Sequence, residues 1–371
     1  MLRAILGSPL NLLIVAAPIS WALEFFAEGS PWVFLSASVS LIPLAGLIGL
    51  GTEELARRSG PAWGGFLNAT FGNAAELIIA LMVLRKGPEM FPLVKASLAG
   101  SIIGNLLLVL GLAILAGGLR FRTQTFNRSA ASAGTAMLAL ATTGLIVPTL
   151  FWYVFQADPQ VHPKEAQNVA SLSEEIAAVL LVVYFLSLVF SLRTHKHLFA
   201  GEETHLPTTG ENHQPEWSRK TSLLVLGLST IGVAVMSEFL VGSIEKAGEA
   251  LHLNSVFVGV IVVAIVGNAA EHSTAVVVAM KNKMDLAMNI ALGSSIQIAL
   301  FVAPVLVFAS MLMGHSPHLD LHFTLLETLA IALSVTLLAL VVQDGESHWM
   351  EGVLLLAVYF IFGLAFYHLP K

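Results

Sequence analysis

The chain has no cysteine and few charged residues, and each shortage excludes a class of protein. Without cysteine there can be no disulfide, thiolate metal site or thiol nucleophile, so oxygen or imidazole groups must hold any metal. Charged residues make up 11% of the 371 residues and hydrophobic residues 56%, whereas soluble domains carry about 25% charged residues. So little charge cannot cover the apolar side chains in water, and no basic block suggests nucleic acid as a partner. The composition therefore predicts a polytopic membrane protein.

Long apolar runs, separated by charged or Gly- and Pro-rich breaks, predict the membrane spans. A helix needs about 20 mostly apolar residues to cross a lipid bilayer. Runs of this kind cover residues 9–27, 32–51, 62–84, 91–116, 127–154, 170–192, 221–243, 254–280, 285–312, 321–342 and 349–369. We therefore expect an all-α polytopic membrane protein with about eleven transmembrane helices.

The positions of Lys and Arg predict the orientation, because cytoplasmic loops are enriched in these residues. A cytoplasmic N-terminus puts most of the 18 Lys and Arg residues on the cytoplasmic side. With an odd number of spans, the C-terminus then lies on the opposite side. The polar segment 193–220, which contains several Glu and His residues, faces the cytoplasm in this topology. It is either a solvated linker or a pH- or cation-sensing element, because histidine titrates near neutrality.

A duplicated motif is the main signal in the sequence. Gly-Asn-Ala-Ala-Glu occurs at 72–76 and again at 267–271, and Gly-Ser begins a further apolar stretch in each half, at 100–101 and 293–294. We expect two repeats of five helices each, and because five is odd the second enters the membrane inverted. Inverted repeats of transporters place the substrate site between them, near the middle of the bilayer. The expected organisation is an N-terminal helix (1–30), the first repeat (31–192), the linker (193–220) and the second repeat (221–371).

The two glutamates of this motif, Glu76 and Glu271, are predicted to bind a cation. An ionised carboxylate in mid-membrane costs about 2.5–3.5 kcal/mol, so each needs a cation, a proton or a water-filled cavity. Glycine and asparagine before each glutamate weaken the helix. A break there would free backbone carbonyls, notably those of Gly72 and Gly267, to face a cavity. Oxygen donors of this kind suit Ca²⁺, which takes 6–8 oxygen ligands.

Further polar residues are expected around the glutamates. Asn73 and Asn268 precede them by three residues and share their helix face, so they either bind the cation or hydrogen-bond between helices. His272 is expected to pack or to relay protons, and Glu238 lies in the helix that leads to the second motif. Neutral side chains that ligate or join helices by hydrogen bonds are Ser101, Asn105, Ser294, Ser295 and Gln297.

At these motifs the sequence resembles the Ca²⁺/H⁺ antiporters (the CAX family) of the cation/Ca²⁺ exchanger superfamily. The resemblance covers nearly the whole chain and is carried by residues 65–77, 267–272 and 293–301. It implies an eleven-helix fold, alternating access and exchange of Ca²⁺ for H⁺. It also implies coordination by Glu76 and Glu271 with backbone carbonyls of both motifs, and neither enzymatic activity nor a cofactor.

Two departures and one further expectation accompany this resemblance. Gly104 stands where a serine is expected before Asn105, and residues 202–216, which match an acidic helix of the family, are short and mildly acidic. A regulatory role of that segment is therefore in doubt. The chain starts directly at the first apolar run, as in prokaryotic members, so we expect a prokaryotic cytoplasmic membrane.

The sequence favours one transport mode over two others. One Ca²⁺ or two protons neutralise two carboxylates, so either load makes the site neutral for the conformational switch. A Na⁺/Ca²⁺ exchanger of the same superfamily usually carries a further acidic residue where Gln297 stands, and a passive cation channel also uses glutamates. A zinc protease is excluded, because Asn268 occupies a position where its motif requires histidine. Oxygen ligands would accommodate Mn²⁺ or Cd²⁺ as well as Ca²⁺.

Overall fold

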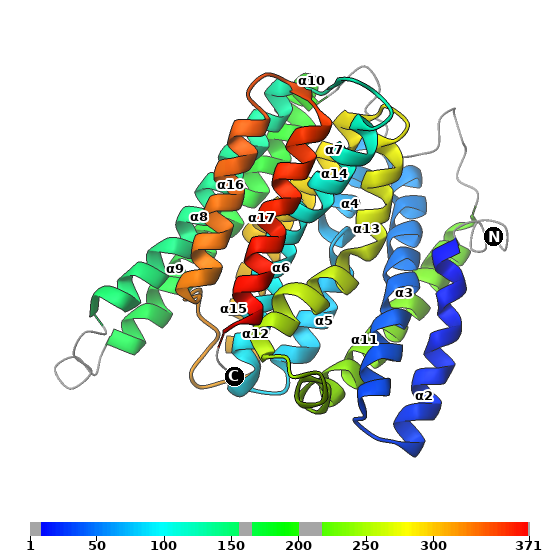
Figure 1. Ribbon diagram of the computed structural model, residues 1–371, viewed down its shortest axis with the longest axis vertical. Coiled ribbons are helices and arrows are strands. Elements are labelled where there is room, and N and C mark those ends of the chain that lie inside the picture. Colours follow the sequence, from blue (N-terminus) through cyan, green and yellow to red (C-terminus); the bar gives the residue numbers. More distant parts are fainter. Residues whose placement is uncertain (1–8, 156–164, 200–216, 370–371) are drawn as a thin grey trace.

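The computed structural model describes residues 9–155, 165–199 and 217–369, and the predicted linker lies largely outside these ranges (Figure 1). The first part of the chain forms η1 (Pro9–Val15), α2 (Ala16–Phe26), α3 (Pro31–Arg58), α4 (Gly60–Phe71), α5 (Ala74–Leu84), η2 (Pro88–Met90), α6 (Phe91–Ile103), η3 (Gly104–Val109), α7 (Leu110–Gly118), β1 (Gln124–Thr125), α8 (Arg128–Phe155), α9 (Glu165–Val189), η4 (Phe190–Thr194) and α10 (Lys196–Phe199). The second part forms α11 (Arg219–Leu251), α12 (Ser255–Phe257), η5 (Val258–Val263), α13 (Ala264–Ala279), α14 (Met284–Gln297), η6 (Ile298–Val302), α15 (Ala303–Leu312), α16 (Leu325–Val341), β2 (Glu346–Ser347) and α17 (Trp349–Tyr367).

The predicted all-α membrane fold is confirmed. Within the described ranges, 8 helices are long and apolar enough to cross a membrane, and three shorter apolar helices cover Leu10–Phe26, Ala74–Leu84 and Leu325–Val341. Together they account for the eleven predicted spans. The boundaries and the inversion of the two repeats stay a prediction.

Two spans differ from a simple apolar helix. The first begins as a 3₁₀-helix, η1, before it continues as α2. Pro18 lies in the first turn of α2 and has no amide hydrogen to extend the α-helical pattern backwards. The span predicted at 62–84 is divided into α4 and α5 at Gly72 and Asn73.

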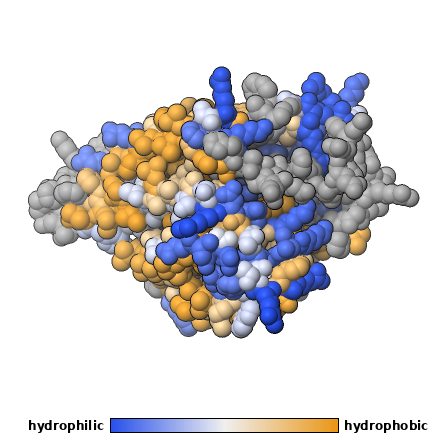
Figure 2. All heavy atoms as spheres, turned by 90° about the horizontal axis from the view of Figure 1, so that it is seen from above, coloured by the Kyte–Doolittle hydropathy of each residue, from blue (hydrophilic) through white to orange (hydrophobic). Residues whose placement is uncertain are grey.

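The centre of the bundle is the continuous stretch α6–η3–α7. In the most apolar 18 residues of this stretch, 83% of the residues are buried inside the protein. The corresponding share for α9 and η4 is 17%, so these elements lie at the periphery. α6 approaches η5 closely, because a Cβ atom at Gly100 would overlap the backbone of Val260. Outward-facing apolar side chains of α9 that would meet lipid include Val179, Val182 and Leu186. Figure 2 shows hydrophilic side chains gathered across one end of the molecule, with hydrophobic ones along its flank.

α3 and α11 pack side by side along much of their length (Figure 1). At one end of this pair, the Glu54 carboxylate accepts a hydrogen bond from the backbone nitrogen of Trp217 (3.2 Å), and Arg58 donates to its carbonyl. The Trp217 side chain packs with Leu47 and Val225. The last residues of the predicted linker are thus anchored to α3.

The segment between α15 and α16 is fastened to two other helices, α6 and α8. Lys95 of α6 forms an ion pair with Asp320 and donates to the carbonyl of His322 (2.7 Å). The imidazole of His322 lies against Trp152 of α8, with ring centroids 5.0 Å apart. Burial and the neighbouring Lys95 charge lower the pKa of His322, which the charge of Asp320 opposes.

Candidate cation site

The first copy of the duplicated motif interrupts a helix, as predicted. Asn73 lies between α4 and α5 with φ −99° and ψ 30°, outside the helical conformation. A Cβ atom at Gly72 would come within 2.8 Å of the Asn68 carbonyl oxygen and 3.2 Å of Gln297 Oε1, so this position requires glycine. Glu76 then falls in the first turn of α5, where the helix dipole favours a negative charge.

The second copy does not interrupt its helix, so the break expected at Gly267 is wrong. α13 runs continuously from Ala264 to Ala279. The Asn268 side-chain nitrogen donates to the Ala264 carbonyl one turn earlier (2.9 Å), which keeps the side chain along its own helix. The backbone irregularity lies upstream instead, in the π-helical η5. The side chain of Asn73, by contrast, hydrogen-bonds to another helix, α14.

Hydrogen bonds from α14 hold the first motif. The Asn73 nitrogen Nδ2 donates to Gln297 Oε1 (2.7 Å), and Asn73 Oδ1 accepts from the Ser294 hydroxyl (2.7 Å). The Ser294 oxygen in turn accepts from Asn105 Nδ2 of η3 (2.9 Å). Asn73, Ser294 and Asn105 are all buried. Ser294 therefore joins the broken helix of the first half to two central elements.

The second motif is held reciprocally by the first half. Asn268 Nδ2 donates to the Ser101 hydroxyl of α6 (3.0 Å). Asn268 Oδ1 is buried and has no hydrogen-bond partner within the described residues. Each asparagine of the duplicated motif thus contacts a serine of the other half, and Asn268 keeps one free acceptor oxygen.

The two glutamates meet at the interface of the halves. A Cβ atom at Gly267 would lie 3.5 Å from Glu76 Cγ and 3.6 Å from Glu76 Oε1, so Glu76 lies against the second motif. The charges of Glu76 and Glu271 are close enough to interact. Glu271 Oε2 is buried without a partner within the described ranges. Among the residues that the structure describes, neither Glu76 nor Glu271 has an ion-pair partner.

Three of the expected supporting residues are not part of this network. The Ser295 hydroxyl donates to the Ala291 carbonyl of its own helix (2.9 Å). Glu238 of α11 forms ion pairs with Arg85 (2.8 Å) and Lys86, which follow the end of α5. His272 Nε2 is buried and no described residue hydrogen-bonds to it.

Sequence reasoning missed the polar residues next to Gln297. A cavity there includes Asn289 of α14 and Ser187 and Ser191 of the α9–η4 segment. The one usable signal was the spacing of Asn289, Gly293 and Gln297, which places them on one helix face.

The arrangement offers carboxylate and neutral oxygens to a hard cation. Within the described ranges, no three His, Cys, Asp or Glu side chains cluster as a metal site. A cation between the motifs would therefore rely on two carboxylates together with amide, hydroxyl or water oxygens. Such a donor set suits Ca²⁺ better than zinc, which prefers nitrogen and sulfur ligands.

Comparison with known proteins assigns the family. The sodium/calcium exchanger protein family matches residues 29–193 and 221–368. The chain is 45% identical over 369 residues to a Ca²⁺/H⁺ antiporter of Synechocystis sp., with 96% of each chain covered. The chain belongs to the Ca²⁺/H⁺ antiporters of the sodium/calcium exchanger superfamily.

A further curated relative and a solved structure support the assignment. The Ca²⁺/H⁺ antiporter ChaA of Bacillus subtilis is 42% identical over 336 residues, which cover 90% of this chain and 92% of that one. The solved structure of native YfkE superimposes with a TM-score of 0.81 at 36% identity, over 98% of this chain and 100% of that one. The family is one of membrane transporters, so the prediction that the protein is not an enzyme is confirmed.

Proposed function

We propose that this chain is a secondary transporter that exchanges Ca²⁺ for H⁺ by alternating access, with Glu76 and Glu271 carrying either the cation or protons. The observation that carries this proposal is the contact between the two motifs. Glu76 of the first half lies against Gly267 of the second, and each motif's asparagine bonds to a serine of the other half. A cation bound there would contact both halves at once.

Charge explains how one site serves two kinds of ion. Two ionised carboxylates without a cationic partner are costly inside a membrane. One Ca²⁺ or two protons neutralise the pair, so both loaded forms can be enclosed while the empty, doubly charged form resists enclosure. This restricts the conformational switch to loaded protein, which is the requirement for exchange.

The polar groups of the network favour Ca²⁺ and H⁺ over Na⁺ as the ions exchanged. Gln297 is neutral and its Oε1 is already engaged by Asn73. The site therefore has only two acidic side chains with which to hold a cation. The relatives named Ca²⁺/H⁺ antiporters in Synechocystis and B. subtilis point the same way. As a bacterial-type antiporter, the protein would lie in the cytoplasmic membrane with its N-terminus and the 193–220 linker inside.

The test is Ca²⁺ uptake into proteoliposomes under an imposed pH gradient, with and without external Na⁺. We expect uptake that follows the proton gradient, ignores Na⁺ and stops when a protonophore collapses the gradient. Uptake that requires a Na⁺ gradient would make the protein a Na⁺/Ca²⁺ exchanger instead. Uptake that needs no gradient beyond that of Ca²⁺ itself would make it a channel.

A further inference from the structure

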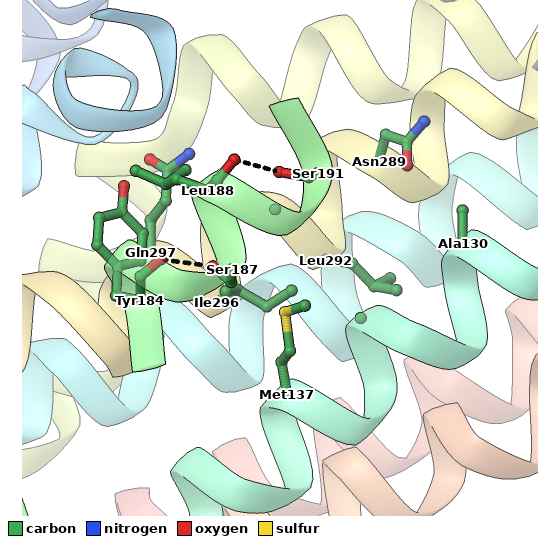
Figure 3. A pocket seen from close by; sticks show the side chains of 12 residues that line it. Ala130, Met137, Tyr184, Ser187, Leu188, Ser191, Asn289, Leu292, Ile296 and Gln297 are labelled. Carbon is green, nitrogen blue, oxygen red and sulfur yellow. Dashed lines mark hydrogen bonds between the residues drawn. The ribbon is translucent and has the colours of Figure 1, made fainter. Parts of the chain in front are cut away.

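A cavity of about 180 Å³ lies between α8, the α9–η4 segment and α14 (Figure 3). At one end it reaches Gln297, which hydrogen-bonds to Asn73 of the first motif, and toward the start of α14 it includes the exposed Asn289. Each of the three elements lines the cavity with small or polar residues spaced four positions apart. These are Asn289, Gly293 and Gln297 of α14, Ser187 and Ser191 of α9–η4, and Ala130 and Gly134 of α8.

The polar atoms at the inner end of the cavity can hold water. Gln297 is half-buried, and within the described ranges its amide makes one hydrogen bond, through Oε1, which leaves Nε2 to donate to a solvent molecule. The hydroxyls of Ser187 and Ser191 donate to carbonyls of their own helix, and their oxygens can still accept. A Cβ atom at Gly293 would meet no atom within 4 Å, so this residue borders open space. At about 30 Å³ per molecule, the cavity has room for about six waters.

The lining distinguishes between the two transported ions. None of the twelve lining residues is charged, so no carboxylate is present to replace the hydration shell of a divalent cation. Ca²⁺ takes at least six oxygen ligands, whereas the wall has five side-chain oxygens, on Tyr184, Ser187, Ser191, Asn289 and Gln297. That of Gln297 already accepts a hydrogen bond from Asn73. Protons need only a chain of hydrogen-bonded waters. Gly72 does not line the cavity and is itself exposed, so the first motif is also reachable by another path.

We propose that this cavity is a water-filled passage that brings protons, and not the divalent cation, to the edge of the site at Gln297. The proposal rests on the proposed function, because it assigns the two exchanged ions to separate paths. Along the passage each proton is passed between water molecules, and no lining residue needs to change its charge. At its inner end, Gln297 is hydrogen-bonded to Asn73, and Asn73 to Ser294, so the passage ends at the hydrogen-bond network between the two motifs.

The hydration of the cavity can be tested directly, because the natural chain contains no cysteine. Single variants Ser187→Cys and Gly293→Cys would be treated in detergent with the charged reagent 2-sulfonatoethyl methanethiosulfonate, which reacts with thiolates and therefore with thiols in contact with water. Leu186→Cys is the matched control, since Leu186 neighbours Ser187 on α9 but faces outward and is 61% exposed. We expect both cavity thiols to react at least about tenfold faster than the control. Equal rates, or inert cavity thiols, would show that the cavity is dry and overturn the proposal.

The assignment to protons is tested by blocking the cavity with the neutral reagent N-ethylmaleimide in the same variants. We expect the Ser187→Cys and Gly293→Cys adducts to lose most of the proton-driven Ca²⁺ uptake, while equilibrium binding of ⁴⁵Ca²⁺ to the purified protein stays unchanged. The Leu186→Cys adduct should keep both. Loss of Ca²⁺ binding together with uptake would place the cation in this cavity, and unchanged uptake would show that protons take another path. Either result overturns the proposal.

The outcome is separable from that of the proposed function. If the unmodified protein takes up Ca²⁺ only under a Na⁺ gradient, the proposed function and the proton path both fail, whatever the reactivity of the cavity thiols. If unmodified protein exchanges Ca²⁺ for H⁺ and the blocked variants do so equally well, only the passage is refuted.

Discussion

Replacing Ser294 with alanine should weaken Ca²⁺ binding by well over a factor of ten. The hydroxyl donates to Asn73 Oδ1 and accepts from Asn105 Nδ2, and all three residues are buried. Ser294→Ala removes the hydrogen-bond partner of the acceptor Asn73 Oδ1 and of the donor Asn105 Nδ2, and each buried atom left unpaired costs about 1–3 kcal/mol. If about 2 kcal/mol of this cost is lost from the free energy of Ca²⁺ binding, the dissociation constant for Ca²⁺ rises about 30-fold.

The neighbouring serine supplies the control. Ser295 is equally buried, but its hydroxyl bonds only to the Ala291 carbonyl of its own helix, so Ser295→Ala removes the same atom without touching the motifs. We expect equilibrium ⁴⁵Ca²⁺ binding in detergent to separate the two variants clearly, with Ser295→Ala close to the native protein. If both variants bind Ca²⁺ equally well, the hydrogen bonds through Ser294 do not organise the site.

Three further predictions concern the site, the packing and pH. Glu76→Gln or Glu271→Gln should reduce proton-driven Ca²⁺ uptake to the level of protein-free liposomes, and normal uptake in either variant removes that residue from the mechanism. Gly100→Ala should lower the melting temperature in detergent, because the added methyl group meets the backbone of η5 and such overpacking costs about 1–3 kcal/mol; Gly104→Ala, which meets no atom within 4 Å, should not. Because the pKa of His322 is lowered in the folded protein from 6.5, protonation favours unfolding, so stability present above pH 6.5 is lost as the pH falls below it. His322→Gln should flatten this decline in melting temperature, and an unchanged pH profile would contradict the assignment.

Hydrophobicity and length were enough to predict the helices, because in a membrane each span must be apolar over about 20 residues. The same principle located Glu76 and Glu271, since an ionisable residue inside an apolar span requires an explanation. The duplicated motif then indicated that the two glutamates belong together, and the structure places Glu76 against Gly267. That they bind the transported ions stays a prediction.

Local conformation could not be read from the motif. The identical pentapeptide ends a helix at Gly72 and continues one at Gly267. The difference comes from the asparagine side chains, since Asn73 bonds to α14 whereas Asn268 bonds to the preceding turn of its own helix as well as to α6. Tertiary contacts decide between these states, and the five residues alone contain no information about them.

The direction of individual side chains was the second feature that could not be predicted from the sequence. Ser294 and Ser295 are adjacent and chemically identical, yet only the first points toward the motifs, because neighbouring residues on a helix face directions about 100° apart. Glu238 was expected near the site because of its position in the sequence, but it forms ion pairs with Arg85 and Lys86, just beyond the end of α5. Choosing among such residues required knowledge of which helices pack against α11 and α14.

The hydrogen bonds that each half makes to the other also determine whether the site depends on the concentration of the protein in the membrane. Asn73 bonds to Ser294 and Asn268 bonds to Ser101, so each copy of the motif obtains its serine from the other half of the chain. A polypeptide with one copy could form these bonds only by meeting a second molecule, and its site would be lost on dilution in the membrane. Joining both copies in one chain makes the encounter intramolecular, with a fixed effective concentration. The site is therefore complete in every molecule, however sparsely the membrane is populated.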